Sequence, residues 1–140
     1  METHLSDVSR VIQLAVAPVF LLTAIATLIN AMNTRLGRIV DRRRVVNARL
    51  EDESSGPEVT ALDGEIRRLA RRIQTIYHAI FCVVLAALLV CLVVAAAFVG
   101  ALMQIDLARV VAVLFILAML SMIAGLGLLL REIYWAVRDN

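Results

Sequence analysis

The sequence predicts an all-α membrane protein: three transmembrane helices with a cytoplasmic antiparallel helical hairpin formed by extensions of the first two. The 140-residue chain has three long runs without Asp, Glu, Lys or Arg, which cover 11–34, 73–105 and 110–130. A membrane-spanning helix needs about 20 mostly apolar residues, so each run is long enough to span a bilayer. The mean hydropathy of +0.87 agrees with this class. A soluble bundle of this length is too small to bury the middle run on every face.

The ends of these runs define the expected segments. The three transmembrane helices are expected at 11–34, 78–100 and 107–130. An Arg-rich hairpin at 35–77, with its turn at 51–57, joins the first two helices, and a short external loop at 101–106 joins the last two. A short external N-terminus at 1–10 and a tail at 131–140 complete the chain. The first ten residues lack the basic n-region of a secretory signal, so the first run is expected to stay in the mature protein.

Arginines set the expected orientation. All 14 basic residues are Arg, of which ten lie in 35–77 and two in 131–140. Under the positive-inside rule, these two segments face the cytoplasm and the N-terminus lies outside.

An apolar heptad pattern predicts that the hairpin is helical. The second arm carries it at Val59, Leu62, Ile66, Leu69, Ile73, Ile76 and Ile80, and the first arm at Leu36, Ile39, Val46 and Leu50, with Arg43 at one seam position. This spacing is typical of a coiled coil. We therefore expect the first span to continue as a helix past Asn33, to turn near Pro57 and to return into the second span. If the hairpin packs in antiparallel register, we expect the arginines of 67–72 to be able to pair with the acids of 51–53.

A polar stripe on the first span is the leading candidate site. Five of its residues share one helix face, namely Gln13, Thr23, Thr27, Asn30 and Thr34, and Asn33 lies at the edge of this face as a further candidate path-lining residue. One interpretation is helix–helix packing, in which Thr and Asn side chains hydrogen-bond across the contact. The other is a water-lined path in an oligomer, with the asparagines near its inner mouth.

A charged array follows this stripe directly, at Arg35, Arg38, Asp41 and Arg42. Just below the bilayer, it suits binding of anionic lipid head groups or the inner mouth of a path. Alternatively, these charges only fix the orientation of the chain in the membrane and form surface salt bridges.

Other features predict structure more than chemistry. Ser121 and Gly125 form a small-x-x-x-small pair, which predicts a close helix contact in the third span. His78 is either an interfacial side chain or a pH sensor. Cys82 and Cys91 are expected to fill apolar space in the helix packing.

The sequence has no metal-ligand spacing, nucleophile elbow or Gly-rich phosphate loop, so we expect no enzyme, metal or cofactor. Ten arginines against seven acids in 35–77 argue against nucleic-acid binding.

Three stretches carry a family resemblance: IQLAVAPVFLLTAIATLINAMNTRLGRIVDR at 12–42, CVVLAALLVCLVVAAAF at 82–98 and LREI at 130–133. They resemble the small bacterial membrane proteins of domain of unknown function family 2721. The resemblance implies a three-span protein of the bacterial inner (plasma) membrane. It implies no activity, because the family has none assigned.

Two functions stay open at this point. The first is a homo-oligomeric, channel-like assembly in which the first span lines the path of an ion. The second is a non-conducting scaffold or regulator, whose Arg-rich hairpin binds anionic lipid or a protein partner. Three helices bury little surface alone, so both functions favour a homo-oligomer.

Overall fold

Three long helices account for almost all of the described chain. The computed structural model describes residues 1–53 and 55–138, apart from the side chain of His4. Helix α1 spans Glu2–Asp52, α2 spans Pro57–Met103 and α3 spans Ala108–Arg138. The prediction of an all-α protein is confirmed. The first helix passes through Asn33 without a break, as the absence of any linker there predicted.

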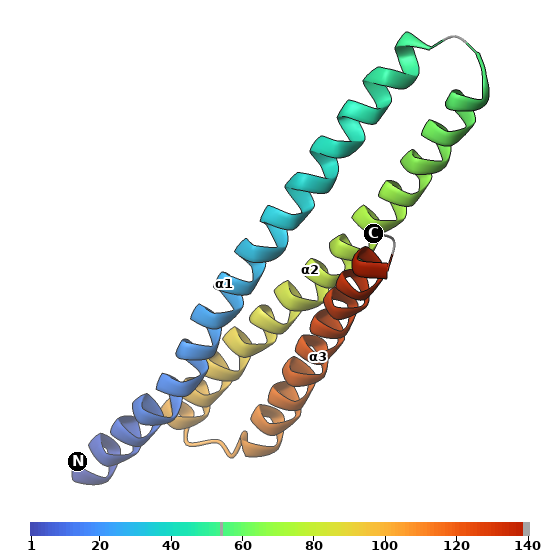
Figure 1. The fold of residues 1–140 in the computed structure, drawn as a ribbon. Coiled ribbons are helices and arrows are strands. Elements are labelled where there is room, and N and C mark those ends of the chain that lie inside the picture. Colours follow the sequence, from blue (N-terminus) through green and yellow to red (C-terminus); the bar gives the residue numbers. More distant parts are fainter. Residues whose placement is uncertain (54, 139–140) are drawn as a thin grey trace.

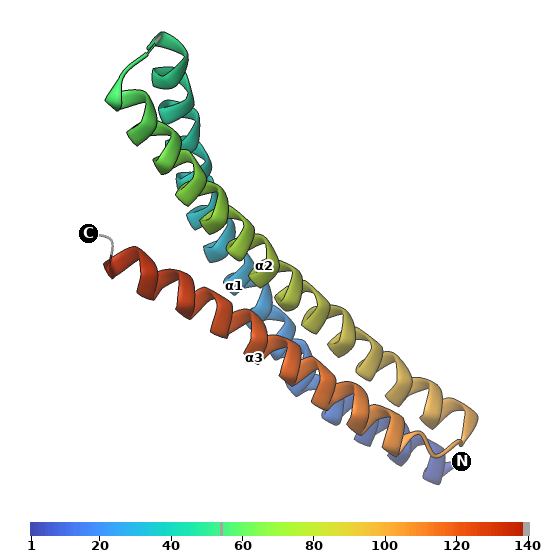
Figure 2. The same cartoon turned by 90° about the vertical axis from the view of Figure 1, so that its right-hand side faces the viewer.

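The helices form a long antiparallel pair with a shorter third helix beside it (Figure 1). Helix α2 packs against both α1 and α3. Figure 2 shows that α3 stops well before the turn that joins α1 to α2, so the two longer helices continue beyond it as a hairpin. We call this the hairpin end, and we call the opposite end, where residues 104–107 join α2 to α3, the loop end.

Helix length explains the two regions. At 1.5 Å per residue, α1 is roughly 75 Å long, whereas the hydrocarbon core of a bilayer is about 30 Å thick. All three helices are long and apolar enough to cross a membrane. Helix α1 is therefore much longer than a span needs, and its Arg-rich part at the hairpin end extends beyond the apolar run 11–34.

Special backbone conformations end the helices at the two connections. Gly56 has a φ of +143°, which an L side chain rarely adopts, and Pro57 is the first residue of α2. At the loop end, Gln104 is left-handed with a φ of 56°, and its backbone N–H donates to Gly100 O. A Cβ at Gly100 would lie 3.2 Å from Ile105 O, so the tight loop favours glycine there.

Two apolar clusters hold the helices together. The first joins all three helices and contains Ile25, Met32, Ala79, Val83, Val90 and Ala118. The second joins the hairpin arms and contains Ile39, Val46, Leu69 and Ile76, flanked by Leu36, Leu62, Ile66, Ile73 and Ile80. The second cluster consists of residues from the predicted apolar seam. The heptad spacing therefore identified the surfaces that pack in the hairpin.

Arg43 occupies the one polar position of this seam. Its Nε atom is buried and has no hydrogen-bond partner in the described part of the chain. A polar group in this state destabilises the fold, because it has lost water without gaining a partner.

Candidate functional site

The polar stripe of α1 lies on the side of the helix that faces away from α2. Ile25 and Met32 are the buried residues of this part of α1. Thr27 and Asn30 each lie two residues from one of them, which places them about 160° around the helix, whereas Asn33 directly follows Met32 and lies about 100° from it, at the edge of the stripe. All six stripe residues, Gln13, Thr23, Thr27, Asn30, Asn33 and Thr34, are exposed. The packing of α1 on α2 therefore leaves the whole stripe uncovered.

The threonine hydroxyls of the stripe are satisfied within α1. Thr23 donates to Val19 O at 3.3 Å, Thr27 to Thr23 O at 3.1 Å, and Thr34 to Asn30 O at 3.0 Å. Such bonds to the preceding turn are common for Thr in helices.

The amides of the stripe differ from the threonines. The side chains of Gln13, Asn30 and Asn33 make no hydrogen bond to any other described residue. An amide in an apolar environment without a partner costs roughly 2–7 kcal/mol, depending on the reference state. Amides that lie within the bilayer therefore require water or another protein surface.

The structure divides the charged array that follows the stripe. Arg42 binds Glu65 of the other hairpin arm, with its Nε 3.0 Å and its Nη2 2.9 Å from Glu65 Oε1. Arg35 lies 3.8 Å from Glu132 of α3. Arg38 and Asp41 are exposed and form no ion pair with described residues. Two of the four predicted residues thus have partners on other helices.

The arginines of 67–72 were expected to pair with the acids of 51–53. This prediction is wrong for Arg67 and Arg72, which form ion pairs with other residues. Arg67 binds Asp63 one turn away, at 3.0 Å, and Arg72 binds Glu132 at 2.8 Å. The antiparallel register is the reason. Residues near the start of the hairpin, rather than those near its turn, lie opposite this part of α2, as the Arg42–Glu65 pair shows.

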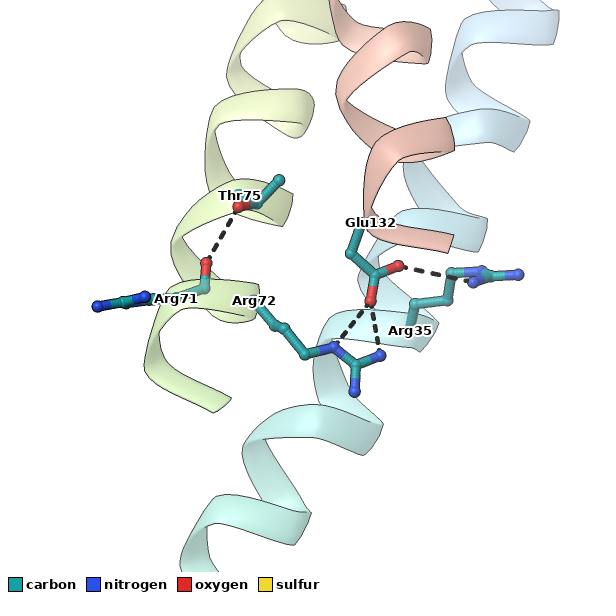
Figure 3. A network of polar contacts seen from close by, with 5 residues as sticks. All are labelled: Arg35, Arg71, Arg72, Thr75 and Glu132. Carbon is teal, nitrogen blue, oxygen red and sulfur yellow. Dashed lines mark hydrogen bonds and ion pairs between the residues drawn. The ribbon is translucent and has the colours of Figure 1, made fainter. Parts of the chain in front are cut away.

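Glu132 is the centre of an ionic cluster to which every helix contributes. Its side chain is only 3% exposed, and Oε1 accepts hydrogen bonds from Nε and Nη2 of Arg72 at 3.2 and 2.8 Å. Arg35 approaches Oε2 from α1, while Oε2 itself has no hydrogen-bond partner among the described residues. Figure 3 shows Arg72 and Arg35 reaching Glu132 from opposite sides. The cluster ties α3 to both arms at the base of the hairpin.

Glu132 was not among the residues predicted to form a site. The predicted segments put it in a tail at 131–140, whereas α3 continues to Arg138. One signal was present in the sequence. Glu132 directly follows Leu130–Arg131 at the end of an apolar run, on the side of the membrane to which the Arg-rich segment 35–77 is assigned. A carboxylate there has an obvious need for a cationic partner, but the sequence does not say which arginine supplies it.

The small residues of α3 lie against α2. Ser121 Oγ donates to Cys82 O at 2.6 Å. A Cβ on Gly125 would lie 2.6 Å from Val83 Cγ2 and 3.1 Å from Ala79 O. The helix backbones therefore approach closely at this point.

The described residues contain no group of three or more His, Cys, Asp or Glu side chains that could hold a metal ion. Cys82 and Cys91 are free thiols. His78 is exposed, and its Nδ1 lies 2.7 Å from Gln74 O on the preceding turn.

These features define a multi-pass integral membrane protein with three helices and a two-helix extension. The chain belongs to the family described as protein of unknown function (DUF2721), whose model matches residues 15–140. No curated protein and no solved structure matches the chain.

Proposed function

We propose that the protein is a non-enzymatic, homo-oligomeric, channel-like assembly in which α1 lines the path of an ion. The observation that supports this most directly is the position of the polar stripe. Its residues Thr23, Thr27, Asn30 and Thr34 lie opposite the face of α1 that packs on α2, and the stripe is exposed along its whole length. In a cyclic oligomer, the same face of every copy can point to the symmetry axis.

The chemistry of the stripe supports contact with water or another copy rather than with lipid. Unpartnered amides are costly in hydrocarbon, and Asn30 lies within a run that has no charged residue. On the hairpin side, the exposed Arg38 and Asp41 continue the same face of α1. By the positive-inside rule, this side is cytoplasmic, so these charges lie at the inner mouth.

The outer half of the same face is apolar. Val16, Val19 and Phe20 lie between Gln13 and Thr23 and are 47%, 52% and 72% exposed. Apolar constrictions can close a path by excluding water. In the proposed assembly, these residues form an apolar gate that limits the flux of ions without abolishing it.

Ion flux from liposomes tests the proposal. The purified protein is compared with Thr27→Leu/Asn30→Leu, which makes the stripe apolar. A matched control, Ala95→Leu/Ala124→Leu, adds leucines at exposed positions of α2 and α3. We expect flux in the wild type and the control and none in the stripe variant, with the same oligomer mass by light scattering for all three. Val19→Ser is expected to increase flux, because it hydrates the gate.

Two results would overturn this function. One is wild-type flux that persists in a correctly assembled stripe variant. The other is the absence of flux for a panel of cations and anions over a range of voltage.

A second candidate is a non-conducting scaffold or regulator whose hairpin binds anionic lipid or a protein partner. It is favoured by the exposed arginines that form no ion pair with described residues, among them Arg38, Arg44 and Arg49. Replacement of these three by Gln in the full chain separates the candidates. Loss of binding to anionic vesicles or to a partner, in a protein without flux, supports the scaffold.

A further inference from the structure

A pocket of about 400 Å³ lies between α2 and α3 at the base of the hairpin. Helix α2 contributes Arg68, Arg71, Arg72 and Thr75, which share one face because they are spaced by three, one and three residues. Helix α3 contributes Arg131, Glu132 and Trp135. The volume is within the range of about 300–1,000 Å³ that is usual for ligand sites.

The pocket has an excess of positive charge. Its acidic side chain, Glu132, is engaged by Arg72 through two hydrogen bonds. Arg68, Arg71 and Arg131 form no ion pair with any described residue. Figure 3 shows that Arg71 extends away from Glu132, so its guanidinium is not part of that cluster. Three like charges around one cavity repel each other, and a bound anion would relieve this repulsion.

The donors suit a phosphate group. Arginine presents a planar fork of N–H donors that matches phosphate oxygens in a bidentate manner. The indole N–H of Trp135 is a further donor on the α3 side. The Thr75 hydroxyl already donates to Arg71 O at 3.1 Å, so the arginines remain the main contacts.

The surroundings favour a lipid over a soluble anion. Helices α2 and α3 present large exposed apolar side chains just beyond the pocket, on the side of the apolar runs. Leu85, which lies on the same side of α2 as Arg71, is 38% exposed, and Leu120, which lies on the same side of α3 as Arg131, is 57% exposed. Tyr134 and Trp135 are exposed at the same level, where aromatic side chains mark a membrane interface. A ligand with both a phosphate and acyl chains would cover both surfaces.

We infer that the pocket formed by Arg68, Arg71, Arg131 and Trp135 binds the head-group phosphate of an anionic phospholipid, whose acyl chains lie along α2 and α3. Basic pockets between transmembrane helices are an established way to bind such head groups. The inference does not depend on conduction, because none of these residues belongs to the polar stripe of α1.

The single tryptophan of the chain, Trp135, makes the pocket directly measurable. The full-length protein is reconstituted in vesicles with phospholipids that carry brominated acyl chains, which quench a nearby indole. Quenching by brominated phosphatidylglycerol is compared with quenching by brominated phosphatidylcholine at equal mole fraction. We expect a preference for phosphatidylglycerol of about tenfold or more.

The pocket variant is Arg71→Gln/Arg131→Gln, and the matched control is Arg44→Gln/Arg67→Gln, which removes the same charge outside the pocket. Each pocket arginine is expected to account for about a fivefold preference. The pocket variant should therefore lose most of the preference, and the control should keep it. If the double variant does not fold, Arg131→Gln alone replaces it, because the Arg131 side chain is not part of the Glu132 ion pairs.

Three results would overturn the inference. Equal quenching by the two lipids shows that the pocket has no head-group preference. Equal loss in the pocket and control variants shows a general charge effect. A change of Trp135 fluorescence with millimolar inorganic phosphate, without preference for phosphatidylglycerol, shows a soluble-anion site instead.

Discussion

Arg72 of α2 donates two hydrogen bonds to one carboxylate oxygen of Glu132 of α3, from Nε at 3.2 Å and from Nη2 at 2.8 Å. This pair fixes the end of α3 against the base of the hairpin, just beyond the level at which Gly125 brings the two backbones close together. Charge-assisted bonds of this kind are roughly twice as strong as neutral ones. The pair is therefore a specific tie between the apolar part of the molecule and its charged arms.

Glu132→Gln is expected to destabilise the protein, because it keeps the shape of the side chain but leaves Arg72 without a counter-charge. Breaking a buried pair costs about 3–5 kcal/mol. Since the Arg72 side chain is 35% exposed, we expect a smaller loss of unfolding free energy, roughly 2 kcal/mol. Denaturant unfolding in detergent, followed by circular dichroism, measures it.

Arg35→Gln is the control for this prediction. Arg35 is 49% exposed and lies 3.8 Å from Glu132, so its loss should cost less than about 1 kcal/mol. An effect of Arg35→Gln as large as that of Glu132→Gln would show that the cluster is not centred on the Arg72 pair.

Gly125→Ala and Gly127→Ala are expected to change stability in opposite directions. A Cβ at residue 125 would lie 3.1 Å from the backbone oxygen of Ala79, which cannot move without shifting α2. A Cβ at residue 127 has nothing within 4 Å, so alanine there should stabilise the helix by up to about 1 kcal/mol. Thermal unfolding of the two variants in one detergent checks this. Equal midpoints would contradict the close approach at Gly125.

Arg43→Leu is expected to stabilise the hairpin. It removes a buried and unpartnered Nε atom and completes the apolar seam at that position. An unsatisfied buried polar group costs about 1–3 kcal/mol, so slower hydrogen exchange is expected along both arms. Arg44→Leu, at an exposed neighbouring position, should leave exchange unchanged. Faster exchange in Arg43→Leu would mean that this arginine supports the seam.

The fold was predictable from the sequence because a local sequence signal marks each element. Uncharged runs defined the three spans, and the heptad spacing identified the residues that pack between the arms, such as Ile39 and Leu69. Gly56 and Pro57 indicated where the helix direction reverses. Each of these signals depends on neighbours in the sequence, and such neighbours are visible without coordinates.

The ionic cluster did not follow from the sequence, because its partners are far apart in the chain. Arg72 and Glu132 are separated by 60 residues, and several nearby arginines were equally plausible partners. The choice depends on how far α3 extends and on the register of the hairpin. The same register explains why Arg67 and Arg72 do not reach the acids of 51–53. The sequence predicted the polar stripe of α1. It did not show which side of α1 packs on α2, because this depends on the three-dimensional arrangement of the helices.

In the proposed assembly, the polar face of α1 meets the same face of another copy, and cross-linking in the membrane tests this contact. The background is Cys82→Ala/Cys91→Ala, which removes both native thiols. Thr27→Cys places a thiol on the stripe, and Ala124→Cys places one at an exposed position near the middle of α3. After treatment with a short bismaleimide, the proposed contact predicts covalent dimers for Thr27→Cys and none for Ala124→Cys. Dimers at Ala124→Cys with none at Thr27→Cys would contradict it, because α3 rather than α1 would then form the contact between copies.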